Sequence, residues 1–217
     1  MKKLLALLLV ALMTISMVAC GEETTSAEPS KTESEATDSI TFKLSEAFGT
    51  DSVECVITET KWLTSEEFKE YSKRNGESLV LDTELVFPDY RVWGVTGVAE
   101  SKLADTSFLC VTYSLQNVGK EDVVSEMESA GFGMMDVPYG TIEVIYDDGY
   151  TFGFSDGDFG KYQGFTYPLR VLSDPITEVM MINVPNQVFE NDDKPLMLKV
   201  TLPSSNEEIE EFIVSIR

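Results

Sequence analysis

Residues 107–116 read SFLCVTYSLQ and are followed directly by NVGKE at residues 117–121. Apolar side chains alternate along the first stretch, which is the pattern of a β-strand with one face toward a core. Asn and Gly in the second stretch tolerate the backbone angles of a tight turn. We therefore predict a β-sheet fold, with the core face of this strand formed by Leu109, Val111, Tyr113 and Leu115.

Short strand patterns recur along the rest of the chain, separated by turn residues at intervals of about eight to twelve positions. DDG at 147–149 predicts a hairpin, because Asp and Gly readily adopt the positive φ that such a turn needs. The whole pattern is typical of an antiparallel immunoglobulin-like β-sandwich, and residues 40–217 are enough for one such domain. The other predicted strands cover residues 40–48, 53–60, 141–146, 150–154, 177–184, 195–202 and 212–217.

One short helix is predicted, inside an insertion at about residues 61–106. TSEE at 64–67 is a capping-box pattern, and Phe68 and Tyr71 are spaced to share one helix face. Gly76 is a natural C-terminal stop for this helix. Later in the insertion, two alternating stretches on either side of a Pro-Asp turn predict a hairpin between residues 78–87 and 90–100.

Three motifs stand in order along the predicted sandwich. They are the strand and NVGKE turn at 108–121, MMINVP at 180–185 and KPLMLKV at 194–200. Together they resemble the immunoglobulin-like domains of Gram-positive lipoproteins, the telokin-like DUF4352 group and its relatives. The insertion departs from that compact family. The resemblance implies a fold and a surface location, and it supplies no catalytic residue.

The N-terminus predicts export and lipidation. MKK is followed by an apolar run at 4–18, which is the layout of a secretory signal peptide covering residues 1–19. MVAC at 17–20 resembles the lipobox of bacterial lipoproteins, and this resemblance implies cleavage before Cys20 and a diacylglyceryl group on its sulfur. Two acyl chains are enough for stable membrane anchoring. The alternative is an ordinary secretory signal that happens to contain a cysteine.

Residues 20–39 predict a lipidated cysteine followed by a disordered acidic linker. Residues 21–39 contain six acids, one lysine and no aliphatic side chain larger than alanine. Such a segment cannot bury enough apolar surface to offset the entropy lost on ordering. We expect the domain at 40–217 to be held by this linker at the extracytoplasmic face of the cell membrane.

Charge and composition exclude several classes of function. The net charge is −22, and without Lys2 and Lys3 fourteen basic residues face thirty-eight acids, a net charge of −24. This sign disfavours nucleic acid and leaves the acyl chains as the expected membrane contact. The chain has no histidine, which removes the commonest general base and every Ser-His-Asp arrangement. We therefore expect no enzymatic activity and no cofactor.

The two cysteines of the domain are Cys55 and Cys110. A secreted compartment permits a disulfide between them. The alternation places Cys55 on the apolar face of its strand, whereas Cys110 falls outside the apolar face of its own strand. This favours two buried free thiols, with the disulfide as the alternative.

Two further groups of residues are candidate sites. Asp147, Asp148, Asp156 and Asp158 could offer oxygen ligands to calcium, although a hairpin turn and a polar loop explain the same residues. Residues 125–139 show no regular pattern and predict a loop. Its Phe132, Met134 and Met135 could form a partner-binding surface, or could be buried against the insertion.

These observations predict a non-catalytic binding or protein-interaction module at the cell envelope. Its partner would be an envelope protein or a cell-wall ligand whose identity the residues do not specify. One alternative is a cell-wall hydrolase that works through carboxylates. Another is an accessory ligand-binding lipoprotein of a transporter.

Overall fold

Strand β8 (Thr106–Asn117) lies at the centre of a five-stranded sheet, here called sheet B, in the computed structural model of the chain. The structure describes residues 41–94, 96–130, 133–147, 149–152 and 164–217. The order in sheet B is β2 (Ala47–Gly49), β3 (Val53–Leu63), β8, β13 (Ile176–Pro185) and β6 (Arg91–Gly94). Neighbouring strands in sheet B are antiparallel except β13 and β6, which are parallel.

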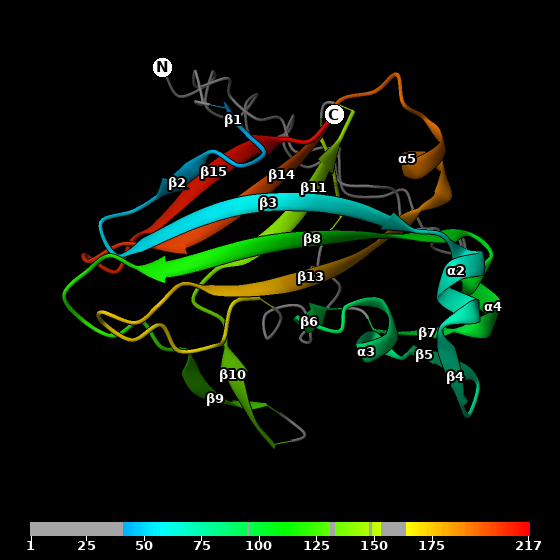
Figure 1. Ribbon diagram of the computed structural model, residues 1–217, viewed down its shortest axis with the longest axis horizontal. Coiled ribbons are helices and arrows are strands. Elements are labelled where there is room, and N and C mark those ends of the chain that lie inside the picture. The colour runs from blue at the N-terminus through cyan, green and yellow to red at the C-terminus, as the bar shows by residue number, and fades with distance from the viewer. Residues whose placement is uncertain (1–40, 95, 131–132, 148, 153–163) are drawn as a thin grey trace, which may run out of the picture. The chain divides into compact units, whose positions relative to one another are not determined.

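A second five-stranded sheet, sheet A, packs against sheet B (Figure 1). Neighbouring strands in sheet A are antiparallel, except that the first strand is parallel to the second. The predicted hairpin around the DDG turn is confirmed, with Tyr146 opposite Tyr150. The order in sheet A is β1 (Thr41–Lys43), β15 (Ile209–Ser215), β14 (Leu196–Pro203), β11 (Thr141–Tyr146) and β12 (Tyr150–Phe152).

The main hydrophobic core lies between the two large sheets. It includes the predicted core face of β8, namely Leu109, Val111, Tyr113 and Leu115. Sheet A contributes side chains such as Leu198 and Val200 from β14. Burial of such side chains is the dominant stabilising term in a domain of this size. The predicted immunoglobulin-like β-sandwich is therefore confirmed.

The insertion forms a third layer that covers the outer face of sheet B (Figure 1). A second buried cluster lies there, with Phe68 stacked on Phe108 at 4.3 Å between ring centroids. Strand β8 is thus buried on both faces, whereas the alternation pointed to one face only. The insertion holds sheet C, formed by β4 (Ser72–Asn75), β5 (Ser78–Leu81) and β7 (Gly97–Ala99), and the short helices α3 (Thr83–Val86) and α4 (Glu100–Leu103).

The predicted helix of the insertion is present as α2 (Ser65–Glu70). Its capping box is confirmed, since Glu67 N–H donates to Thr64 Oγ1 and Thr64 N–H donates to the Glu67 carboxylate. The predicted end at Gly76 is wrong, because the chain leaves the helix after Glu70 and enters β4. Gly76 instead forms the turn between β4 and β5 with φ of +63°.

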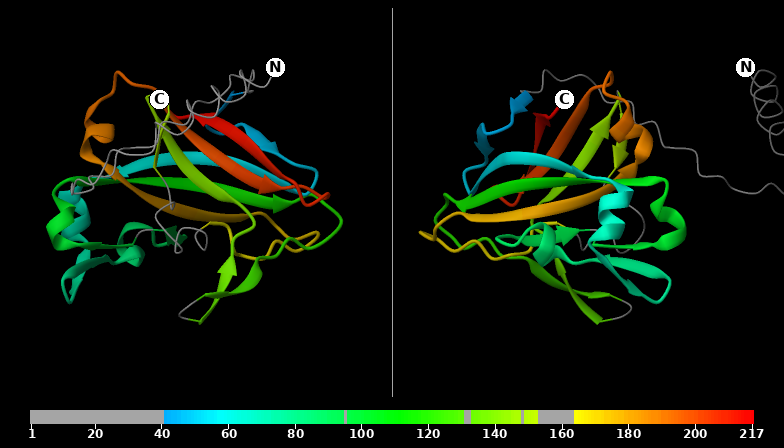
Figure 2. Two further views of the ribbon diagram at one scale, coloured as in Figure 1. Left: turned by 180° about the vertical axis from the view of Figure 1, so that it is seen from behind. Right: turned by 45° about the vertical axis from the view of Figure 1, so that its right-hand side comes forward.

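Two other predictions about local structure are corrected. The predicted hairpin between residues 78–87 and 90–100 is confirmed only where β5 pairs antiparallel with β7, with Ser78 opposite Ala99. Between these two strands the chain forms α3 and β6, and β6 joins sheet B instead of continuing the hairpin. The stretch 125–139 is not an irregular loop: it contains the antiparallel hairpin β9 (Glu126–Ala130) and β10 (Gly133–Val137). Both views in Figure 2 show this hairpin standing away from the two large sheets.

The last helix, α5 (Asn186–Glu190), follows β13 and leads into the loop before β14. Within the part of the chain that the structure describes, no helix has both the length and the apolar character needed to cross a membrane.

Candidate functional site

The hairpin β9–β10 presents two exposed methionines on one face. Residues directly opposite each other in a sheet, and residues two apart along a strand, share a face. Met134 lies opposite Ser129, which is two positions from Met127. Met127 and Met134 are therefore neighbours on one face, and they are 57% and 58% exposed.

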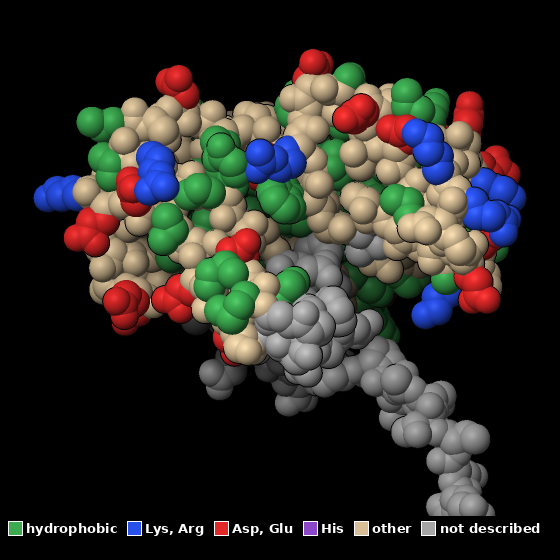
Figure 3. Space-filling model, turned by 90° about the horizontal axis from the view of Figure 1, so that it is seen from below, with side chains coloured by type: hydrophobic (Ala, Val, Ile, Leu, Met, Phe, Trp, Pro, Cys, Tyr) green, Lys and Arg blue, Asp and Glu red, His purple; other side chains and the backbone are tan. Residues whose placement is uncertain are grey.

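The three residues of the predicted partner surface, Phe132, Met134 and Met135, do not lie together on one face of this hairpin. Met134 belongs to the exposed face, while Met135 lies opposite Glu128 on the other face and is half-buried. Phe132 lies outside the described residues. Met127, which the sequence reasoning missed, completes the exposed pair. Seen from below, hydrophobic side chains lie among carboxylates on the surface of this side of the molecule (Figure 3).

The base of the hairpin is held by backbone hydrogen bonds to one short segment, residues 165–169. Before the hairpin, Val123 N–H donates to the Leu169 carbonyl at 3.0 Å, and Leu169 N–H donates to the Val123 carbonyl at 2.8 Å. After the hairpin, Tyr139 N–H donates to the Phe165 carbonyl at 3.0 Å. These bonds fix the chain at both ends of the hairpin, so that its orientation is set by the sandwich.

The same segment connects the hairpin to a buried carboxylate in the core. The Tyr139 hydroxyl donates to the Tyr167 carbonyl at 2.9 Å, and the Tyr167 ring lies 4.5 Å from the guanidinium carbon of Arg91. Arg91 in turn lies 3.6 Å from Glu178 Oε1. A cation over an aromatic face is attracted by the ring quadrupole. The hairpin base, Tyr167, Arg91 and Glu178 thus form one continuous chain of contacts.

Glu178 is the only buried acidic residue in the described part of the chain, at 5% exposure. It lies on β13, directly opposite Tyr113 on one side and Arg91 on the other. Its Oε2 accepts a hydrogen bond from Trp93 Nε1–H at 2.7 Å and one from the Tyr113 hydroxyl at 3.0 Å. A buried charge needs such partners, because desolvation without them is very unfavourable.

Burial raises the pKa of the Glu178 carboxyl above its ordinary value. The hydrogen bonds from Trp93 and Tyr113 and the nearby Arg91 charge oppose this effect, but desolvation is the larger influence. The pKa of the Tyr113 hydroxyl is also raised, first by burial and then by the charge of Glu178. Both groups therefore resist ionisation more than they would in water.

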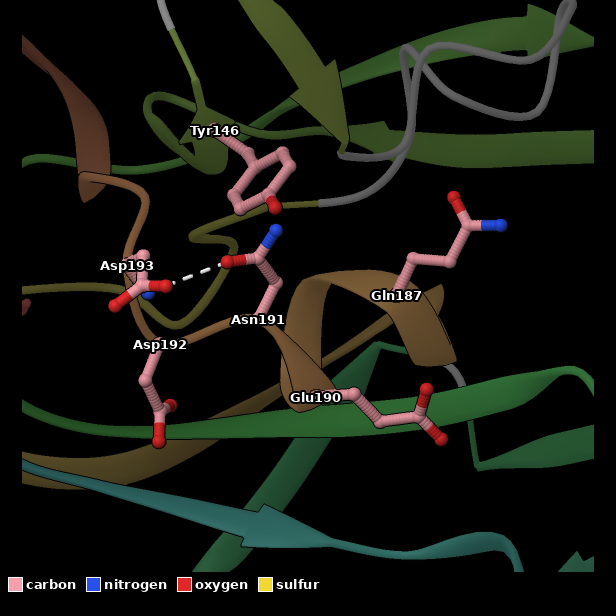
Figure 4. Close-up of a pocket in the computed structure, with 6 residues that line it drawn as sticks. All are labelled: Tyr146, Gln187, Glu190, Asn191, Asp192 and Asp193. Carbon is pink, nitrogen blue, oxygen red and sulfur yellow. Dashed lines mark hydrogen bonds between the residues drawn. The ribbon is translucent and has the colours of Figure 1, made fainter.

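A separate hollow of about 670 Å³ lies beside α5, lined by Tyr146, Gln187, Glu190, Asn191, Asp192 and Asp193. Figure 4 shows the Tyr146 ring and the Asn191 side chain facing each other across it, with Gln187 and Glu190 on α5. Within the loop, Asn191 Oδ1 accepts a hydrogen bond from the Asp193 N–H at 3.2 Å. The lining is polar and open, and Glu178 is not part of it.

The cysteines do not form the disulfide that was considered as an alternative. Cys55 and Cys110 are both buried free thiols. Cys55 lies opposite Leu115 and faces the core between the large sheets, whereas Cys110 lies opposite Lys61 and faces the insertion. A sheet separates the two sulfur atoms, and no rotamer can join side chains on opposite faces.

The predicted calcium site can be followed only at Asp147. Its carboxylate pairs with Lys194 Nζ at 2.9 Å, and its backbone has φ of +43° in the hairpin turn. Asp148, Asp156 and Asp158 lie outside the described residues. Among the residues that the structure describes, no three Cys, Asp or Glu side chains are placed to share a metal ion.

Sequence reasoning missed the Glu178 cluster, although a signal was available. Glu178 is the one charged residue in a largely apolar strand, ITEVMMINV at 176–184. A charge at a core-facing position predicts buried partners. Those partners come from Arg91, Trp93 and Tyr113, which are far away in sequence and carry no local signature.

Comparisons with known proteins give distant structural likenesses. No protein-family model matches the chain, and no curated protein sequence matches it. One similar solved structure is an uncharacterized β-sandwich protein from Clostridium difficile, with 15% identity and a TM-score of 0.44 over 85% of this chain and 100% of that one. Another is a candidate lipoprotein, ycdA, from Bacillus subtilis, with 12% identity and a TM-score of 0.37 over 78% of this chain and 38% of that one.

Proposed function

We propose that the chain is a lipid-anchored interaction module that works at the extracytoplasmic face of the cell membrane and has no catalytic role. The anchor would be Cys20, reached through the signal and lipobox pattern at 1–20. The strand and turn motifs also support a distant relation to the telokin-like DUF4352 group. In this proposal the β-sandwich is a rigid support for a binding surface.

The observation that carries the proposal is the exposed methionine pair on the hairpin. Met127 and Met134 expose two flexible, apolar side chains to water, beside Asp136 on the same face of a hairpin whose two ends are hydrogen-bonded to residues 165–169. Methionine adapts to irregular partner surfaces. Binding residues are often found on segments that project from a rigid scaffold, as this hairpin does.

Site-specific photo-crosslinking in intact cells tests the surface. A photoreactive amino acid at Met134 should capture a partner, and capture should fall when Met127 is changed to Ser. The matched control is the same probe at Leu85, an apolar residue of α3 that is 66% exposed. Equal capture at Leu85 would refute the assignment of the surface to the hairpin.

The anchor is tested separately by Cys20→Ser. This variant lacks the acyl acceptor and should leave the membrane fraction, as measured by fractionation and by loss of fatty-acid labelling. Retention of the variant in the membrane fraction would contradict lipid anchoring through Cys20.

The two alternatives have different support. An accessory ligand-binding lipoprotein of a transporter would need a ligand site, and the hollow beside α5 has a suitable volume. The hollow is open and its lining is polar, however, whereas ligand sites are mostly enclosed and apolar, so it gives this alternative little support. A carboxylate hydrolase would need two acids with separated pKa values at one cleft. Among the acids that the structure describes, the one with a raised pKa is Glu178, and it lies in the core with Oε2 already accepting two hydrogen bonds.

A further inference from the structure

Arg91 differs from the other three arginines of the chain in how its charge is used. Each of the other three has a guanidinium nitrogen 2.5–3.2 Å from a carboxylate oxygen: Arg74 with Glu100, Arg170 with Asp122 and Arg217 with Asp192. Arg91 Nη1 lies 3.6 Å from Glu178 Oε1, which is too long for a hydrogen bond. Within the described residues, the Arg91 guanidinium donates no hydrogen bond. Its donors therefore remain for another acceptor.

Two aromatic rings hold the Arg91 guanidinium in place. Its central carbon lies 5.5 Å from the centroid of the Trp93 ring and 4.5 Å from that of the Tyr167 ring. Arg91 and Trp93 are two positions apart on β6 and so share one face of the strand. A guanidinium that lies over aromatic rings still presents N–H groups along its planar edge. An acceptor can therefore bind Arg91 without displacing either ring.

The fold fixes the parts of this cluster before any ligand arrives. Trp93 Nε1–H donates to Glu178 Oε2 at 2.7 Å, and Tyr167 belongs to the segment 165–169, whose backbone is hydrogen-bonded on both sides of the hairpin β9–β10. The Glu178 side chain is 7% exposed, whereas that of Arg91 is 51% exposed. The carboxylate is thus buried, while the guanidinium reaches water. A binding group that is already ordered loses little entropy when its ligand binds.

The charges of the cluster select the kind of ligand. Among the described residues, no second Lys or Arg pairs with Glu178 or lies over either ring. A phosphate dianion would bring two negative charges to one cation that already has a carboxylate beside it, in a chain of net charge −22. A carboxylate brings only one charge. Its planar shape also matches the guanidinium edge, which can donate two parallel hydrogen bonds to it.

We propose that Arg91, Trp93 and Tyr167 form a binding site for a carboxylate at the β6 edge of sheet B. The two oxygens of the ligand accept hydrogen bonds from the guanidinium. An apolar group attached to the carboxylate packs on Tyr167, which is 37% exposed. The carboxylate belongs to a small organic acid or to the C-terminus of a peptide. This site goes beyond the hairpin surface of the proposed function and needs neither of its methionines.

Titration with benzoate tests the site, because benzoate joins a carboxylate to an aromatic ring. Benzamide is the neutral isostere, and phenyl phosphate carries the dianion. Binding to the full lipidated chain in lipid nanodiscs is followed at neutral pH by tryptophan fluorescence, since Trp93 lies in the site. Benzoate should bind at least tenfold more tightly than benzamide and more tightly than phenyl phosphate.

A peptide arm distinguishes the two sources of the carboxylate. The probe is the tripeptide alanyl-alanyl-phenylalanine with a free C-terminus, and its control is the same tripeptide with an amidated C-terminus. Binding of the free form at least tenfold more tightly than benzoate, with loss of binding in the amide, assigns the site to a peptide terminus. Binding of the free form no tighter than that of benzoate assigns it to a small acid.

Variants of the chain provide the third arm. Arg91→Gln should weaken benzoate binding at least tenfold, because the charge and the planar donor edge are lost. Glu178→Gln should strengthen binding at least threefold, because the carboxylate beside Arg91 becomes neutral while its hydrogen bonds can be kept. A misfolded variant cannot produce this gain. The matched control is Arg74→Gln, which removes an exposed arginine that pairs with Glu100 and should leave binding within twofold of the wild type.

Four results would overturn the inference. Equal binding of benzamide would mean that the charge of the ligand is not recognised, and tighter binding of phenyl phosphate would contradict the selection of a single charge. Equal weakening by Arg74→Gln would place the site elsewhere. Weaker binding by Glu178→Gln than by the wild type would show that its carboxylate does not oppose the ligand. Crosslinking at Met134 is independent of all four, so the hairpin surface can stand if this site fails.

Discussion

Removing the Glu178 side chain should destabilise the domain, because two hydrogen-bond donors then lose their acceptor. In Glu178→Ala, Trp93 Nε1–H and the Tyr113 hydroxyl lose their acceptor. Tyr113 is fully buried, whereas Trp93 is half-buried and can reach water more easily. A buried donor left without an acceptor costs about 1–3 kcal/mol, so the two together should lower the free energy of unfolding by about 2–4 kcal/mol.

The Glu178→Gln variant separates the hydrogen bonds from the charge. A glutamine carbonyl can still accept from Trp93 and Tyr113, so this variant should stay within about 1.5 kcal/mol of the wild type at neutral pH. Because glutamine cannot ionise, this variant also lacks the pH dependence that Glu178 gives to the free energy of unfolding.

The sign of that pH dependence follows from the raised pKa of Glu178. Because the folded state holds this proton more tightly than the unfolded state, the contribution to stability is fully present below the ordinary glutamate pKa. It is lost as the pH rises toward the pKa in the folded state. The wild type should therefore lose stability relative to Glu178→Gln as the pH is raised through this window.

Urea unfolding, monitored by tryptophan fluorescence, measures both the loss of stability in Glu178→Ala and the pH dependence. Trp93 is a suitable reporter because it contacts Glu178 directly and is one of two tryptophans. Titrations at a series of pH values should be compared between the wild type and each variant. Two results would refute the reasoning. One is a free energy of unfolding for Glu178→Ala within about 0.5 kcal/mol of the wild-type value. The other is a difference in free energy of unfolding between the wild type and Glu178→Gln that does not change with pH.

Three further predictions concern the rest of the fold. Cys55 and Cys110 should react with a thiol reagent only after unfolding in urea, because both thiols are buried. Burial also raises the pKa of both thiols, and it raises that of Cys110 to about 12. Rapid labelling of the native protein would contradict their placement. Thr64→Ala removes the cap of α2 and should cost about 1 kcal/mol in a urea titration. Phe108→Ala opens a cavity under Phe68 and should cost about 3–5 kcal/mol by the same measurement, and a loss below 1 kcal/mol would mean that the insertion does not pack on sheet B.

Local features of the fold were readable from sequence because they depend on neighbours along the chain. The alternation at 107–116 identified a core face, the DDG turn placed a hairpin, and the capping box located α2. Each of these signals lies within a few residues of the structure that it specifies. The hairpin at 125–139 was missed because glutamate, aspartate and glycine, which recur along it, are depleted in strands.

The candidate site, in contrast, depends on contacts between distant residues. Met134 was proposed from its type, but its exposed neighbour Met127 is identified only by the hairpin register. Residues 121–160 contain ten Asp and Glu. Three of these acids, Asp122, Glu143 and Asp147, pair with Arg170, Lys199 and Lys194, and no local sequence pattern identifies those bases as the partners.

The sequence by itself determined a β-rich domain, its main core face and the anchor prediction at Cys20. Periodicity and short motifs suffice for these features, because they reflect local backbone geometry. Only the tertiary structure decided that both faces of β8 are buried, that the thiols are separated by a sheet and that Glu178 has three partners. Those facts arise when strands far apart in the chain pair and stack, and no local pattern encodes which partners they meet.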